Sequence, residues 1–185
     1  KDYSVDASAI TSSNIGSTVS GEMRSQSMLA VVVAAFFMLL YIWFRFKDLR
    51  FAGSAIIALI HDVLVVLALY AVARISVGSA FIACMLTVIG YSVNDTIVIF
   101  DRIRENKKTL RDESPESLRV LANESITQTL SRSISTSLTT VVMVLMLLIL
   151  GVTSIREFAL PLLVGIVCGT YSSICIATEL WYVMK

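Results

Sequence analysis

The stretch GYSVNDTIVIFDRIREN, residues 90–106, places the carboxylate of Asp95 inside an apolar run that becomes abruptly charged at Asp101. An ionisable side chain at the centre of a bilayer costs about 2.5–3.5 kcal/mol on insertion scales, so each one needs a structural or functional explanation. At about 1.5 Å per helical residue, Asp95 would lie roughly 9 Å inside the point where the charge begins. The stretch therefore predicts a membrane helix with an acid buried near one end.

The composition favours a membrane protein throughout. Hydrophobic residues make up 56% of the 185 residues and charged residues only 16%, whereas about a quarter of a soluble domain is charged. A helix needs roughly 20 apolar residues to cross a hydrocarbon core of about 30 Å, and five runs qualify. We expect an all-α, polytopic membrane helix bundle with spans at about 28–46, 51–73, 77–100, 132–150 and 158–181.

Basic residues are concentrated in two of the connections between these spans. The first connection holds Arg45, Lys47 and Arg50, and the long connection 101–131 holds Arg102, Arg104, Lys107, Lys108, Arg111 and Arg119. The positive-inside rule places both in the cytoplasm, which also places the C-terminus there and the polar N-terminal segment outside. Residues 1–26 carry no signal-like segment, so we expect them to be the tail of an extracytoplasmic domain that an upstream span exports. Residues 27–183 then form the transmembrane domain.

The cytoplasmic connection 101–131 is expected to contain one amphipathic surface helix. Ser114 is a candidate N-cap and Pro115 suits the first helical position. The apolar side chains that follow recur at near-helical spacing: Leu118, Leu121, Ile126 and Leu130. This pattern predicts a helix that leads into the fourth span.

Asp95 and Arg132 are the candidates for an ion relay. Arg132 begins the fourth span, which enters from the same side, so the two side chains are expected at similar depth on neighbouring helices. A carboxylate whose charged arginine neighbour comes and goes can take up and release a proton as the helices move. The alternative is a static buried pair that holds the two helices together.

Other polar residues lie within the predicted spans. His61 and Asp62 stand halfway along the second span, either as a second part of an ion path or as a polar pair bonded to hydroxyls of a neighbouring helix. Asn94, Thr136 and Thr140 are expected to line the polar path. The hydroxyl-rich start of the fourth span and the GxxxG pair of Gly165 and Gly169 in the fifth suggest that both spans are interior.

No pattern in the sequence indicates an enzyme. The sequence contains no GxxxxGK[ST] phosphate-binding loop, and no Ser/His/Asp or metal-ligand spacing. Cys84, Cys168 and Cys175 lie in apolar runs and are expected to be small core residues. His61 is the only histidine, so no histidine-based metal cluster is expected.

Four segments closely resemble, in order and spacing, the SecF family of the bacterial SecDF accessory complex. The most specific is TVIGYSVNDTIVIFDRIREN (87–106). The others are RFKDLRFAGSAIIALIHDV (45–63), SITQTLSRSISTSLTT (125–140) and GVTSIREFALPLLVGIVCGTYSSICIA (151–177). SecF-like proteins belong to the resistance-nodulation-division superfamily and have six spans, so the resemblance implies that this chain holds five of the six.

By this resemblance the chain is an accessory subunit of the Sec export machinery that couples an ion gradient to preprotein translocation. The coupling ion would be H⁺, or Na⁺ in some lineages, and no other cofactor is implied. Asp95 matches the carboxylate of the family motif, Arg132 its arginine, and Asp62 the aspartate of its His-Asp helix.

The implied partners are a SecD-like homologous half, a SecYEG-type translocon, a YidC-type insertase and an unfolded preprotein, with no nucleic acid; the implied location is the bacterial inner membrane. Two other functions stay open. The chain could belong to a lipid or drug exporter of the same superfamily, or to a scaffold that holds translocon components together without transport. The sequence leaves open whether it comes from a separate SecF or a fused SecDF.

Overall fold

The computed structural model describes residues 17–46, 48–75, 77–110, 112 and 114–184, and the elements within them are all helical. In chain order these are α1 (Ser17–Phe46), α2 (Leu49–Val72), α3 (Ser79–Lys107), α4 (Pro115–Leu150), α5 (Thr153–Tyr171), the π-helix η2 (Ser172–Ala177) and α6 (Thr178–Val183). The predicted all-α class is confirmed. Much of the predicted N-terminal tail, residues 1–16, lies outside the described residues.

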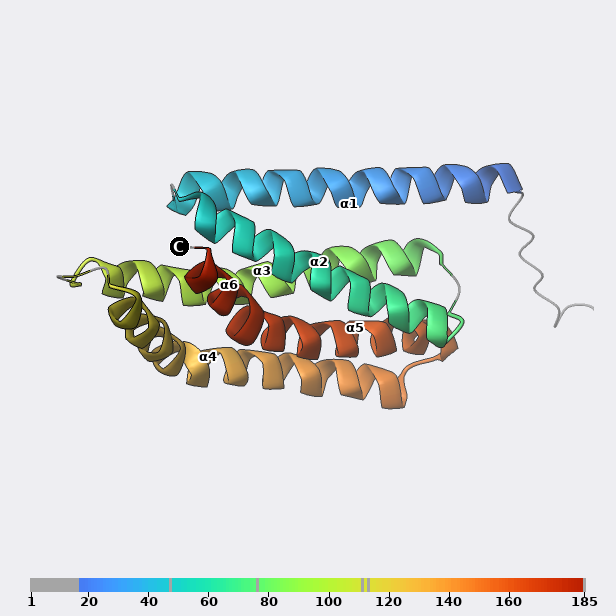
Figure 1. The fold of residues 1–185 in the computed structure, drawn as a ribbon. Coiled ribbons are helices and arrows are strands. Elements are labelled where there is room, and N and C mark those ends of the chain that lie inside the picture. The colour runs from blue at the N-terminus through green and yellow to red at the C-terminus, as the bar shows by residue number, and fades with distance from the viewer. Residues whose placement is uncertain (1–16, 47, 76, 111, 113, 185) are drawn as a thin grey trace, which may run out of the picture.

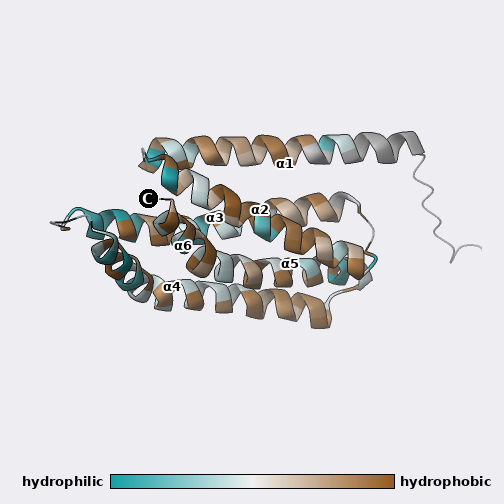
Figure 2. Ribbon diagram, viewed as in Figure 1, coloured by the Kyte–Doolittle hydropathy of each residue, from teal (hydrophilic) through white to brown (hydrophobic). Residues whose placement is uncertain are grey.

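Five helical stretches are long and apolar enough to cross a membrane. They are Leu29–Phe46, Leu49–Val72, Ala80–Lys107, Pro115–Leu150 and Ile155–Val183, the last of which runs through α5, η2 and α6. In the ribbon coloured by hydropathy these stretches are mostly hydrophobic, and hydrophilic residues gather where α3 ends and α4 begins (Figure 2). Two of the stretches continue well into the connection predicted for 101–131, so that connection is largely helical.

The helices form one bundle with α1 and α4 on opposite sides (Figure 1). Helices α2, α3 and α5 lie between them, and each contacts the other two. This arrangement buries parts of α2, α3 and α5 on several sides and leaves much of α1 and α4 exposed within this chain. The fourth span was predicted to be interior, but only 17% of its most apolar window is buried here.

Two apolar clusters hold the bundle together. The first contains stacked or edge-to-face aromatic rings from four helices, namely Phe46 of α1, Phe51 of α2, Phe100 of α3 and Trp181 of α6. Such ring pairs add about 0.5–1.5 kcal/mol each beyond the area they bury. The second cluster joins α2, α3, α4 and α5 through Val66, Val88, Val144 and Ile166, among others. The polar groups described below lie on these same helices.

Helix α4 begins as the sequence predicted. Ser114 caps it by accepting a hydrogen bond from the Ser117 amide at 3.3 Å, and Pro115 occupies the first turn. However, the amphipathic segment is not a separate surface helix, because α4 runs without interruption from Pro115 to Leu150. Its sequence holds no glycine or proline after Pro115, so nothing stops the helix between the two parts.

Candidate functional site: two buried carboxylates in the bundle

Two aspartates are buried in the membrane-spanning helices. Asp62 of α2 is 0% exposed and Asp95 of α3 is 6% exposed. Each lies in an apolar helix whose length and packing place its middle residues inside the bundle. A buried carboxylate is tolerated only where hydrogen bonds, counter-charges or a bound proton compensate for its lost hydration. The surroundings of the two acids differ in this respect.

Asp62 is held by hydroxyl groups from two neighbouring segments. The Ser92 hydroxyl of α3 donates to Asp62 Oδ2 at 2.5 Å, and the Ser172 hydroxyl of η2 donates to the same oxygen at 2.6 Å. Short O–H···O⁻ bonds of this kind are about twice as strong as neutral ones. One oxygen of Asp62 therefore ties α2 to both α3 and η2.

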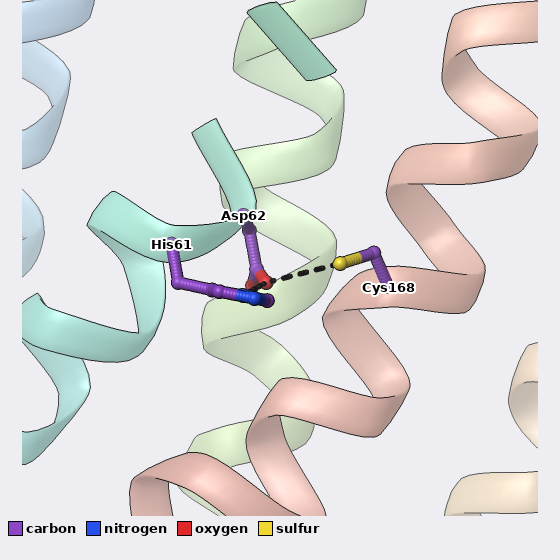
Figure 3. Close-up of side chains that lie close together, drawn as sticks. All are labelled: His61, Asp62 and Cys168. Carbon is purple, nitrogen blue, oxygen red and sulfur yellow. Dashed lines mark hydrogen bonds and ion pairs between the residues drawn. The ribbon is translucent and has the colours of Figure 1, made fainter. Parts of the chain in front are cut away.

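The other oxygen, Asp62 Oδ1, faces two different groups. His61 Nδ1 lies 3.1 Å away, and the Cys168 thiol of α5 lies at a distance of 3.8 Å from sulfur to oxygen (Figure 3). The His61 side chain is 38% exposed, so the cluster reaches the surface of this chain at the imidazole. Sequence reasoning did not expect His61, Asp62 and Cys168 to meet.

Gly169 allows α5 to approach this site closely. A β-carbon there would lie 3.2 Å from Ser92 Cβ and 3.7 Å from Asp62 Oδ2. Immediately after α5, the wider turn of η2 directs its serines into the bundle: beside the Ser172 bond, the Ser173 hydroxyl donates to the Ser92 carbonyl at 3.0 Å. π-Helical turns are rare and occur frequently at functional sites.

Asp95 lacks such support. Ser133 of α4 is the side chain that interacts with its carboxyl group. The contact nevertheless falls short of a regular hydrogen bond, because neither Asp95 Oδ2 nor Ser133 Oγ has a partner in the described part of the chain. A buried polar atom without a partner costs about 1–3 kcal/mol. The space between α3 and α4 therefore holds an acceptor and a hydroxyl that a proton, a water molecule or a small cation would satisfy.

The expected pair of Asp95 and Arg132 is not formed in this structure. The two residues do lie at similar depth, because Ser133, the next residue along α4, is the one beside Asp95. The Arg132 side chain is exposed, and among the described residues no ion pair joins it to Asp95. Successive residues of a helix point about 100° apart, so when Ser133 faces α3 its neighbour Arg132 cannot do so as well.

Two of the three residues expected to line the polar path face outward. Asn94 and Thr136 are exposed and Thr140 is half-buried. Thr136 donates to the Arg132 carbonyl at 2.8 Å and Thr140 to the Thr136 carbonyl at 3.0 Å, so both hydroxyls serve their own helix. The residues that line the carboxylates are instead Ser92, Ser133 and Ser172, which sequence reasoning did not assign to a carboxylate. Ser92 lies one helical turn before Asp95 but bonds Asp62 of another helix, so no spacing in the sequence indicates this contact.

Known protein families and individual proteins resemble this chain in sequence. A family model described as "Protein export membrane protein SecD/SecF, C-terminal" matches residues 1–185. The chain is 46% identical to a protein translocase subunit SecF of Alicyclobacillus acidocaldarius, over 88% of this chain and 53% of that protein. It is 44% identical to the protein translocase subunit SecDF of Thermus thermophilus, over 94% of this chain and 23% of that protein.

The fold is also similar to solved structures. A crystal structure of SecDF from Thermus thermophilus, described as a translocon-associated membrane protein, superposes with a TM-score of 0.82 at 45% identity. The match covers 89% of this chain and 22% of that one. A SecDF crystal structure in a super-membrane-facing form gives a TM-score of 0.80 at 44% identity. The chain thus spans about half the length of the SecF relatives and under a quarter of the SecDF chains.

Proposed function

The chain belongs to the SecD/SecF C-terminal family of protein export membrane proteins, and on that premise we propose that it is the ion-coupling membrane part of a SecF subunit. In this proposal the subunit uses an ion gradient, carried by protons, to assist the translocation of preproteins by the Sec machinery. It performs no enzymatic step itself.

The proposal rests on the unsatisfied hydrogen bonding of the buried Asp95 carboxyl group. Its buried carboxyl group has one oxygen without a partner, opposite an equally unpartnered Ser133 hydroxyl, at the contact between α3 and α4. A buried group in this position changes the energy of the helix contact strongly when it gains or loses a proton, because a buried charge needs compensation that a neutral acid does not. Asp62 is a weaker candidate, because two hydroxyls already satisfy one of its oxygens.

In a second arrangement of α4, Arg132 would take the place of Ser133 beside Asp95. A rotation of α4 by about 100°, the angle between successive helical residues, would exchange Ser133 for Arg132 opposite Asp95. The guanidinium would then stabilise the ionised carboxylate and displace its proton. Moving one charge through 100 mV is worth about 2.3 kcal/mol, which shifts an equilibrium by roughly fifty-fold, since about 1.4 kcal/mol is a factor of ten. A gradient of this size can therefore bias the equilibrium between the two arrangements of α4.

The proposed partners follow from the exposed surface of α4 and from the family. Four exposed residues of α4 recur at spacings of three and four residues and therefore share one face of the helix: Arg132, Ser135, Thr136 and Thr139. A charged residue facing lipid is costly, so we assign this face to a SecD-like homologous half. A SecYEG-type translocon, a YidC-type insertase and the preprotein would act through the assembled complex, with the basic connections and the C-terminus in the cytoplasm of a bacterial cell.

The test is gradient-driven preprotein export in inverted membrane vesicles that contain the full-length protein and its partner subunit. Asp95→Asn keeps the side-chain shape but cannot carry the proton, so we expect the stimulation by an imposed proton gradient to be lost. The matched control is Asp101→Asn, at an exposed acid on the same helix that pairs with Arg45 at 2.9 Å. It should retain the stimulation at equal protein abundance.

Two further results would bear on the same proposal. Arg132→Gln should impair the stimulation as Asp95→Asn does, whereas Arg132→Lys should retain part of it because the charge remains. Stimulation that follows an imposed sodium gradient alone would reassign the coupling ion to Na⁺. If Asp95→Asn exports preprotein as well as the unchanged protein under a gradient, Asp95 has a structural role and the scaffold function is favoured.

A further inference from the structure

The cluster of His61, Asp62 and Cys168 combines three kinds of metal-binding atom. The imidazole nitrogen, the carboxylate oxygen and the thiol sulfur all lie within 4.8 Å of one another. Two of these residues are adjacent on α2, and the third approaches from α5 (Figure 3). Together they bring one nitrogen, one oxygen and one sulfur donor to a single point beside the carboxylate.

Two of the three distances between the donor atoms are close to those around a tetrahedral ion of the size of Zn²⁺. Zinc bonds of about 2.0 Å to nitrogen and oxygen and about 2.3 Å to sulfur separate the nitrogen and oxygen ligands by about 3.3 Å, and the sulfur and oxygen ligands by about 3.5 Å. The structure has 3.1 Å between His61 Nδ1 and Asp62 Oδ1, and 3.8 Å between Cys168 Sγ and the same oxygen. Movements of a few tenths of an ångström would bring these two edges to the zinc values. The third edge, between the imidazole nitrogen and the sulfur, lies within 4.8 Å and would have to close to about 3.5 Å, which rotation of the His61 and Cys168 side chains would supply.

The hydrogen bonds from serine hydroxyls to Asp62 leave Oδ1, the oxygen that faces His61 and Cys168, available to bind a metal ion. Both serine hydroxyls donate to Oδ2, whereas the side chains that approach Oδ1, among the residues the structure describes, are His61 and Cys168. Metal-binding carboxylates typically have their second oxygen fixed by hydrogen bonds, which orients the ligand and is worth roughly 10–100-fold in affinity. Ser92 and Ser172 would supply that support from α3 and η2.

The charges also balance. A divalent cation bound by a thiolate, a carboxylate and a neutral imidazole forms a complex without net charge, and a neutral complex is cheaper to bury than a lone ionised aspartate. Binding would release the thiol proton of Cys168 to water as the sulfur–metal bond forms. His61 would bind through Nδ1 and keep its proton on Nε2.

We propose that His61, Asp62 and Cys168 form a binding site for Zn²⁺, or a divalent transition-metal ion of similar ligand preference, which fastens α2 to α5. A mixed nitrogen, oxygen and sulfur donor set favours such ions over Mg²⁺ or Ca²⁺, which prefer oxygen alone. Three protein ligands leave a fourth position for water, and the half-exposed imidazole opens the site to the surface of this chain. The site shares no residue with the Asp95 relay and does not depend on it.

The test is Co²⁺ binding to the purified full-length complex in detergent, because tetrahedral Co²⁺ bound to a thiolate gives a charge-transfer absorption band. We expect one Co²⁺ ion per protein with this band, and its loss when Zn²⁺ is added. Cys168→Ser should abolish the band, and His61→Gln should weaken binding by at least about tenfold. Cys175→Ser, at an exposed cysteine of the next helical segment, is the matched control and should retain both the band and the affinity.

The membrane abundance of every variant is measured alongside, so that a lost band reflects lost metal binding rather than lost protein. A second readout is the melting temperature of the complex, which Zn²⁺ should raise in the unchanged protein and in Cys175→Ser but not in Cys168→Ser. Absence of the thiolate band in the unchanged protein would overturn the proposal. So would a band that survives in Cys168→Ser, because the sulfur ligand would then lie elsewhere.

Discussion

At the scale of single residues, small side chains decide how closely the helices approach the buried acids. The serine hydroxyls at positions 92, 133 and 172 contact the two carboxylates, and each comes from a different helical segment. At Asp62 this approach depends on the two glycines of α5, because Gly169 lies against Ser92 and Asp62, and Gly165 lies against Val88 and Val66. The GxxxG pair that the sequence offered as weak evidence of packing therefore has a definite place in this structure.

Substitution of these glycines should reveal the packing directly. A β-carbon at Gly165 would lie 2.3 Å from Val88 Cγ2 and 3.1 Å from Val66 Cγ2, and one at Gly169 would meet Ser92 Cβ at 3.2 Å. We expect Gly165→Ala to destabilise the protein by about 1–3 kcal/mol, the usual range for an overpacked site, and Gly169→Ala by less. The measurement is thermal unfolding of the full-length complex in detergent.

Gly90 is the control for this series, since a β-carbon there meets no atom of another helix within 4 Å in the described part of the chain. Gly90→Ala should leave stability unchanged or raise it by up to about 1 kcal/mol, because alanine is the better helix former. Equal gains in stability at Gly90, Gly165 and Gly169 would show that helix propensity, rather than close helix contact, governs these positions.

At the scale of elements, local chemistry explains how the helices bend and end. Figure 1 shows that the first turns of α4 lie at an angle to the rest of the helix. Hydroxyls of Ser125, Thr127 and Thr129 donate to carbonyls four residues earlier along this part. Such bonds commonly bend helices. They lie in the part of the helix that changes direction, which contains no glycine and no proline after Pro115.

The end of α2 provides a prediction at this scale. Arg74 follows the C-cap Ala73 and has a φ of 52°, while the Ile75 amide donates to the Tyr70 carbonyl at 3.1 Å. This is a Schellman ending, in which glycine is the usual residue at the left-handed position. A left-handed residue with a β-carbon costs about 1–2 kcal/mol, so Arg74→Gly should raise the free energy of unfolding by about 1 kcal/mol.

The neighbouring position supplies the matched control. Ala73 has right-handed helical angles, with a φ of −77°, so Ala73→Gly should lower the free energy of unfolding by roughly 0.5–1 kcal/mol. Thermal unfolding of both variants in the full-length complex gives the comparison. A loss of stability in Arg74→Gly would mean that contacts of the arginine side chain outweigh the backbone strain.

At the scale of the whole molecule, this chain forms a bundle with two unlike exposed sides. Helix α1 exposes apolar and aromatic side chains, including Phe36, Phe37 and Phe44, as a helix facing lipid does. Helix α4 exposes Arg132, Ser135 and Thr136, polar groups that lipid would not solvate. The difference supports the proposed placement of the SecD-like half against α4.

Photo-crosslinking can test this placement. A photoreactive amino acid at Ser135 should form an adduct with the SecD-like subunit in membranes that contain the whole complex. The same amino acid at Phe36, which is 58% exposed on α1, should give little or no adduct with that subunit. Adducts of equal yield from both positions would contradict the assignment of the polar face of α4.

The sequence by itself determined the class of fold, the number of candidate spans and the family. These follow from properties that are local along the chain: apolar runs of sufficient length, the cap at Ser114 and the motif around Asp95. The depth of Asp95 relative to the start of the fourth span was also predictable, because the helical rise converts residue number into distance.

Only the tertiary structure decided which side chains meet. Whether Ser133 or Arg132 faces Asp95 depends on the rotation of α4 about its own axis, and a difference of about 100° exchanges one for the other. Residues 62, 92, 168 and 172 come together because Gly169 and the wide turn of η2 bring the end of α5 against α2 and α3. Neither the rotation of α4 about its axis nor the π-helix η2 leaves a regular pattern in the sequence. Both arise from packing between segments up to 110 residues apart.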